Sequence, residues 1–194
     1  MVSSSFRSRR SRFFDLIFKE TRLAGAYLVE PERNWDERGF FARVFCEKEF
    51  AQFNLASRFV QCNVSFNARK GTLRGMHYQA EPRAECKLVR CTRGAIYDVI
   101  IDLRRESPTF CEWAGFTLDE QNGQALYIPA GFAHGFQTVT ESSEVFYQMS
   151  EFYYPELARG VRWNDPRFAI EWGLPHPLLS ARDASYPDFL DGRS

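Results

Sequence analysis

Three short stretches of alternating residues put polar side chains on strand faces that a closed β-barrel would fill with apolar ones. In GMHYQ, His77 and Gln79 share one face, because successive side chains of a strand point to opposite sides. Lys87 in KLVRC and Tyr147 in EVFYQMS each share a face with two apolar neighbours. The ordinary pKa of histidine lies near neutrality, which suits proton abstraction. The pattern predicts a wet ligand cavity.

The elements that position these side chains are predicted to be short strands. From about residue 58, β-prone runs alternate with Gly-, Pro- and Asp-containing turns, which favours a sandwich or barrel over a βαβ fold. A hairpin is expected within residues 23–45 and short helices over 47–55 and 178–184. The segment after the last strand is expected to wrap over the barrel. No G-x-G-x-x-G follows a strand, so a Rossmann cofactor site is not supported.

Length and composition limit the class of protein. The 194 residues suit one domain, and 44% hydrophobic and 16% aromatic residues indicate a folded chain. The 25 basic and 25 acidic residues balance, so no overall field attracts nucleic acid or an anionic membrane. No apolar run is long enough to span a bilayer. We therefore expect no nucleic-acid or membrane partner.

The N-terminal residues and the cysteines bear on domain limits and compartment. MVSSSFRSRRSR is rich in Ser and Arg, and we expect residues 1–22 to be a basic, flexible tail before a single domain at 23–194. The five cysteines are odd in number and form no CxxC motif. They are interpreted as reduced, structural thiols of a cytoplasmic protein.

Several specific motifs follow one another along the chain. In order, they are Gly71–Gln79 (GTLRGMHYQ), Lys87–Cys91 (KLVRC), Ser107–Phe110 (SPTF), Ile128–Phe136 (IPAGFAHGF) and Arg162–Asp165 (RWND). In this order and spacing they resemble the dTDP-4-dehydrorhamnose 3,5-epimerase family, with similarity from Glu37 to Asp183. The resemblance implies an all-β fold, a cupin-type double-stranded β-helix or jelly-roll barrel with a few short helices. It also implies a homodimer that works without a metal or organic cofactor.

The implied reaction acts on a nucleotide-linked 4-keto-6-deoxyhexose, with dTDP-4-dehydro-6-deoxyglucose converted to dTDP-4-dehydrorhamnose as the favoured case. Protons at C3 and C5, both next to the C4 ketone, are removed and returned to the opposite face. The chemistry needs a base, an acid and a positive group beside the enolate oxygen. By the resemblance, His77 is the base and Asp183 its orienting carboxylate, Tyr147 is the proton donor, and Lys87 lies beside the enolate oxygen.

The matched motifs also imply a set of substrate-binding residues. They are Arg74, Gln61, Asn63, Arg38, His134 and Arg182. Arg74 matches a diphosphate ligand, a role that suits the bidentate guanidinium. His134 is expected to have a structural or substrate-contacting role and no part in proton transfer.

The chain departs from the family pattern at three places. Arg43 stands where the family has an acidic residue that holds the nucleobase across the dimer. Glu85-Cys86 stands where Gln-Gly is usual, and Gln148 replaces a Lys after the proposed donor. The departures at Arg43 and at Glu85-Cys86 leave the nucleotide (dTDP, CDP or GDP) and the sugar open. The choice of C3, C5 or both stays open because the same catalytic residues serve both carbons.

Two other functions remain as alternatives at this stage. A metal-dependent cupin enzyme would usually present two histidines one residue apart and a later Glu, whereas His77-Tyr78-Gln79 lacks the second histidine. A non-catalytic sugar-nucleotide-binding cupin would tolerate loss of the base or the acid, whereas this chain keeps His77 and Tyr147.

Overall fold

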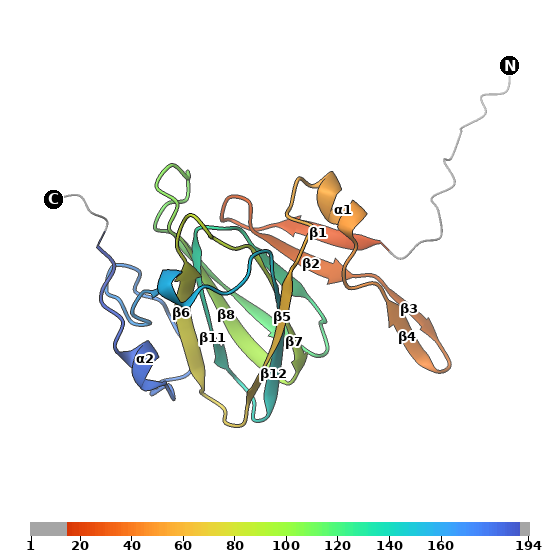
Figure 1. Ribbon diagram of the computed structural model, residues 1–194. Coiled ribbons are helices and arrows are strands. Elements are labelled where there is room, and N and C mark those ends of the chain that lie inside the picture. The colour runs from red at the N-terminus through yellow and green to blue at the C-terminus, as the bar shows by residue number, and fades with distance from the viewer. Residues whose placement is uncertain (1–14, 191–194) are drawn as a thin grey trace, which may run out of the picture.

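Two antiparallel sheets face each other and form a jelly-roll barrel (Figure 1). The computed structural model describes residues 15–190. Within these residues the first sheet has the strand order β1 (Leu16–Glu20), β2 (Tyr27–Pro31), β10 (Ala125–Ile128), β7 (Lys87–Arg93), β12 (Ser143–Met149) and β5 (Gln61–Asn67). The second has the order β13 (Ala158–Gly160), β6 (Leu73–Gln79), β11 (Phe132–Thr138), β8 (Ala95–Asp102) and β9 (Trp113–Asp119), and a 3-10 turn, η1 (Pro155–Leu157), precedes β13. The all-β, cupin-type prediction is confirmed.

Apolar side chains from both sheets fill the space between them. Val89 of β7 and Val145 of β12 pack in the same buried cluster as Ile100 of β8, and all three are fully buried. Because side chains alternate along a strand, Lys87 and Tyr147 lie on the same faces as these valines. They mark the place where the packed core gives way to a cavity.

The outer faces of both sheets are covered as well. Helix α1 (Glu47–Gln52) packs Phe50 in a cluster on the outer side of the first sheet, and it lies within the predicted helix at 47–55. Val161 and Phe168 cluster with Met76 of β6 on the outer side of the second sheet, so the C-terminal segment wraps over the barrel as predicted. No helix within residues 15–190 has the length and apolar character needed to cross a membrane.

Helix α2 (Ala181–Ala184) is held beside β6 by main-chain pairing of the residues before it. The Leu73 amide donates to the Leu178 carbonyl at 2.9 Å, and the Leu178 amide donates to the chain just before β6. Ser180 caps the helix, since its hydroxyl accepts from the Asp183 amide at 3.1 Å. This pairing fixes Asp183 next to β6.

Strand β1 corrects the predicted N-terminal boundary. Residues 16–20 pair in register with β2, from Leu16 opposite Pro31 to Glu20 opposite Tyr27, so they belong to the sheet. The predicted tail, residues 1–22, was too long. The basic residues upstream suggested a tail, but it was continued through a short amphipathic strand whose Leu16 is buried. Residues 1–14 of the predicted tail lie outside the described residues.

The predicted hairpin is formed by β3 (Arg33–Asp36) and β4 (Gly39–Ala42), which pair only with each other among the described strands. It projects away from the barrel (Figure 1). Large aromatic side chains on it are open to solvent, with Trp35 at 67% and Phe41 at 63% exposure.

Candidate active site

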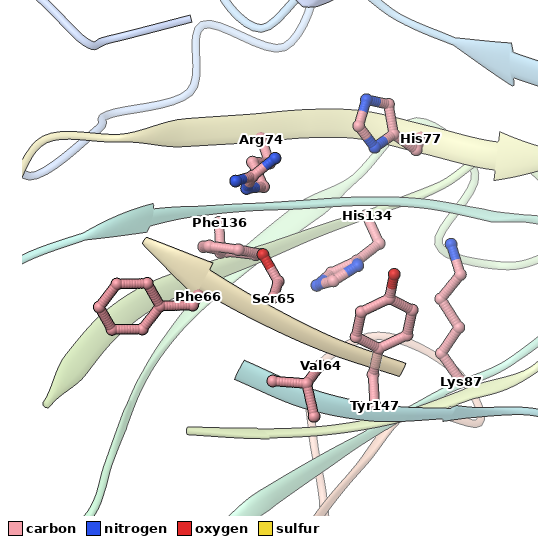
Figure 2. A pocket seen from close by; sticks show the side chains of 9 residues that line it. All are labelled: Val64, Ser65, Phe66, Arg74, His77, Lys87, His134, Phe136 and Tyr147. Atoms are coloured by element: carbon pink, nitrogen blue, oxygen red, sulfur yellow. The ribbon is translucent and has the colours of Figure 1, made fainter. Parts of the chain in front are cut away.

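Two adjoining cavities of about 490 and 420 Å³ open between the sheets. They share four lining residues, Arg74, His77, Lys87 and Tyr147. Figure 2 shows His77 reaching in from β6 while Tyr147 and Lys87 extend toward it from β12 and β7. The cavities thus have a histidine on the side of one sheet and a phenol and an ammonium group on the side of the other.

His77 is paired with a carboxylate. Its Nε2 lies 2.6 Å from Oδ1 of Asp183, whose side chain is 7% exposed while the imidazole is 40% exposed. Burial alone raises the pKa of Asp183, but hydrogen bonds from His77 and Ser180 outweigh it and bring that pKa below its ordinary value. An ionised carboxylate on one ring nitrogen orients the imidazole and stabilises its protonated form.

Tyr147 places a phenol hydroxyl in the cavity from the other sheet. Burial raises the pKa of its hydroxyl, and the nearby negative charge of Glu85 adds to the rise while Arg74 opposes it. A raised pKa keeps the phenol protonated, as a general acid must be before it acts. The side chain is half-buried and lines both cavities.

Lys87 is a nearly buried cation on the cavity wall. Its Nζ lies 3.1 Å from Oε1 of Glu85, and the two side chains are 11% and 4% exposed. A lysine in such a place is suited to stabilise negative charge on a substrate oxygen, because a site that excludes water strengthens the interaction.

His134 belongs to a second histidine–carboxylate pair beside the first. It stands opposite His77 across the β11–β6 ladder, and its Nε2 lies 3.0 and 3.1 Å from the two carboxylate oxygens of Asp98. Asp98 is fully buried and His134 nearly so. Asp98 was not predicted from the sequence. It lies among the apolar residues of AIYDVIID, where it cannot be told apart from a core position.

Close contact between β6 and β11 brings the two histidines together. A Cβ on Gly135 would lie 2.7 Å from Sδ of Met76, 2.8 Å from the carbonyl oxygen of Arg74 and 2.8 Å from Cα of Gly75. Two of these atoms are backbone and cannot move aside cheaply. The glycines of LRGMH and FAHGF are thus required by packing between the strands.

Arg74 of β6 is an exposed residue that lines both cavities. Its Nε donates to Oδ1 of Asn67 at 2.7 Å, which holds the side chain along the wall. A guanidinium held in this way is suited to bind phosphate oxygens.

Gln61, Asn63 and Arg182 line the second cavity. Gln61 Nε2 donates to Asn63 Oδ1 at 3.3 Å, and Arg182 Nε donates to the Tyr186 hydroxyl at 2.9 Å. Tyr153, which sequence reasoning missed, also lines this cavity, and its amide donates to Gln61 Oε1. The adjacent tyrosines of EFYYP were the available signal.

Arg38 is the predicted site residue that the described chain places elsewhere. It lies at the turn of the β3–β4 hairpin, 83% exposed, and is paired with Asp36 at 2.5 Å. It lines neither cavity, whereas the other nine predicted residues line one or both. Within a single chain, Arg38 and the cavity do not meet.

No group of three or more His, Cys, Asp or Glu side chains among residues 15–190 is arranged to hold a metal ion. The two histidines of the site each contact an aspartate instead, His77 with Asp183 and His134 with Asp98.

Comparison with known proteins agrees with this geometry. The family model described as dTDP-4-dehydrorhamnose 3,5-epimerase matches residues 20–191. The dTDP-4-dehydrorhamnose 3,5-epimerases of Sinorhizobium fredii and Pseudomonas aeruginosa are 40% and 45% identical, over 91% and 89% of this chain and 91% and 97% of their own lengths. The crystal structure of the Bacillus anthracis epimerase, with TDP and PPi bound, is 42% identical with a TM-score of 0.88, covering 90% of this chain and all of that one. This chain therefore belongs to the dTDP-4-dehydrorhamnose 3,5-epimerase family and is an isomerase.

Proposed function

We propose that this enzyme inverts C3, C5 or both in a nucleotide-linked 4-keto-6-deoxyhexose, with dTDP-4-dehydro-6-deoxyglucose as substrate and dTDP-4-dehydrorhamnose as product. The observation that carries the proposal is the placement of His77, paired with Asp183 of α2, on one sheet and of Tyr147 on the facing sheet. The family also favours this function over a metal-dependent or a non-catalytic cupin.

The reaction begins with proton removal. Nε2 of His77 is engaged by Asp183, so the other ring nitrogen is the one that takes the proton from the carbon next to the ketone. The electron pair moves onto the ketone oxygen, where the ammonium group of Lys87 stabilises the enolate. Tyr147 then donates its proton to the opposite face of the same carbon, and the ketone re-forms.

Arg74 is assigned to the diphosphate, and Gln61, Asn63 and Arg182 to the polar wall of the second cavity. His134, held by Asp98, contacts the substrate and transfers no proton. Arg43, which replaces the family's acidic residue, pairs with Glu49 at 2.5 Å and is held in its own chain. Since Arg43 lacks the carboxylate of that acidic residue, the choice of nucleotide is tested directly with dTDP-, CDP- and GDP-linked substrates.

We further propose a homodimer in which the β3–β4 hairpin meets a second copy. The hairpin carries exposed Trp35, Phe40 and Phe41 and the exposed Arg38. Single-chain geometry keeps Arg38 from its own cavity, so a substrate contact by this residue requires the second copy. Light scattering on the purified protein measures the mass. The cytoplasmic location stays a prediction that is compatible with five free thiols.

Deuterium uptake from solvent tests the function. 4-Keto-6-deoxy sugars linked to dTDP, CDP or GDP are incubated with enzyme in D₂O, and label at C3 and C5 is followed by NMR. Uptake with inversion at either carbon supports an epimerase and identifies its substrate. Absence of uptake with all three nucleotides would overturn the proposed function.

A further inference from the structure

Glu85 is a buried carboxylate on the wall of the second cavity. It lies two residues before Lys87, and side chains two apart on an extended chain point the same way. Both groups accordingly face the cavity, with Oε1 of Glu85 3.1 Å from Nζ of Lys87. The other carboxylate oxygen, Oε2, is buried and has no hydrogen-bond partner among the described residues.

A buried carboxylate with an unpaired oxygen is unfavourable. Ion-pair attraction offsets the loss of water around a buried charge only where the remaining lone pairs also find donors. The polar side chains across the cavity do not supply one, because Gln61 donates to Asn63 and to Met149, and Asn63 donates to Met149. Because Glu85 lines the cavity, a ligand hydroxyl that reaches its carboxylate would supply the missing donor.

The proposed substrate limits which hydroxyl this is. In a 4-keto-6-deoxyhexose joined to its nucleotide through C1, hydroxyls remain at C2 and C3. Lys87 is assigned to the ketone oxygen at C4, and Glu85 contacts Lys87 directly. The hydroxyl next to the ketone is the one at C3.

We infer that Glu85 determines specificity, holding Lys87 at the ketone oxygen and accepting a hydrogen bond from the C3 hydroxyl of the sugar. The inference rests on the proposed function. A charged acceptor in a buried site discriminates strongly against a substrate that lacks its donor, because the acceptor is then left unpaired. The Coulombic influence of Glu85 on the Tyr147 hydroxyl agrees with a position close to the reacting carbons.

The test compares three substrates of the same nucleotide: the 4-keto-6-deoxyhexose, its 3-deoxy analogue and its 2-deoxy analogue. For each substrate we measure deuterium uptake at C3 or C5, whichever of these two carbons the wild type labels. For the wild type we expect kcat/KM to fall on the order of 10²-fold for the 3-deoxy analogue and less than about 10-fold for the 2-deoxy analogue. Glu85→Gln keeps the shape and removes the charge, and should reduce the 3-deoxy discrimination to about 10-fold. Glu85→Ala should abolish it.

Glu144→Gln is the matched control. It removes the same charge from β12, where Glu144 pairs with the Thr92 hydroxyl outside the cavity, and should discriminate like the wild type. The inference is overturned if both Glu85 variants discriminate like the wild type, or if the wild type does not discriminate against the 3-deoxy analogue. Either result leaves the proposed epimerase function standing. Glu85-dependent discrimination against the 2-deoxy analogue would also overturn it. A wild type that labels no 4-keto sugar nucleotide instead defeats the proposed function.

Discussion

The imidazole of His77 and the carboxylate of Asp183 lie 2.6 Å apart although 106 positions separate them in the chain. The pairing of Leu178 with the start of β6 brings the C-terminal segment to the histidine, and Ser180 then starts the short helix that carries Asp183. The His77–Asp183 pair is therefore assembled by the wrap over the barrel, so disturbance of that wrap should alter the proposed base.

Asp183→Asn should leave the barrel folded and lower kcat on the order of 10²-fold or more, because the amide does not stabilise the protonated imidazole. Turnover is measured by NMR and the fold by circular dichroism. Asp188→Asn, which removes an aspartate paired with Arg162 outside the cavities, is the control and should keep wild-type turnover. Near-normal kcat in Asp183→Asn would remove the carboxylate from the mechanism.

The lowered pKa of Asp183 predicts a pH dependence of stability. A carboxyl whose folded-state pKa lies below its ordinary value of 3.8 stabilises the protein above that value. The contribution is lost as pH falls through the lowered folded-state pKa. The free energy of unfolding of the wild type should thus exceed that of Asp183→Asn at pH 6 by more than at pH 3. Urea unfolding at both pH values measures the difference, and an equal gap at both would contradict the assigned hydrogen bond between His77 and Asp183.

Tyr147→Phe should separate exchange from inversion. His77 can still remove a proton and return a solvent-derived one to the same face, so deuterium enters while net epimerisation falls on the order of 10²-fold or more. His77→Ala is the companion variant and should lose both. If exchange and inversion fall by the same factor in Tyr147→Phe, the hydroxyl acts in substrate placement or enolate formation.

Arg74→Ala should raise KM on the order of 10- to 100-fold with a smaller change in kcat, if the contact with the diphosphate is equal in ground and transition states. Steady-state kinetics with the preferred sugar nucleotide measure both constants. Arg93→Ala removes an exposed arginine at the end of β7 that lines neither cavity, and should change neither constant. A loss confined to kcat would move Arg74 into the proton-transfer step.

Gly135→Ala should destabilise the barrel by about 1–3 kcal/mol or more, because the added methyl group meets backbone atoms of β6 at 2.8 Å. Thermal unfolding measures the effect. Gly173→Ala is the control, since a Cβ there meets nothing within 4 Å, and its melting temperature should match the wild type. Equal stability of the two variants would show that β6 and β11 separate more easily than their contact implies.

Features that depend on residues close together in the chain could be predicted from the sequence. Alternation along a strand is local, so the shared faces of Lys87 with Val89 and of Tyr147 with Val145 were predictable and place the cavity correctly. The ordered motifs identified the family and nine residues that line the cavities. Strand β1 was missed because its alternation is weak and basic residues precede it, so the predicted tail included it.

What the sequence by itself determined is the strand pattern, the family and the residue types available for proton transfer. The tertiary structure alone decided which of them meet. The contact between His77 and Asp183, the pairing of His134 with Asp98 and the unpaired oxygen of Glu85 depend on strand order and on the C-terminal wrap. Arg38 shows the same dependence in reverse, since its hairpin carries it away from the cavity of its own chain. Spacing along a chain does not report such distances, because they are set by which strands pair and how the sheets pack.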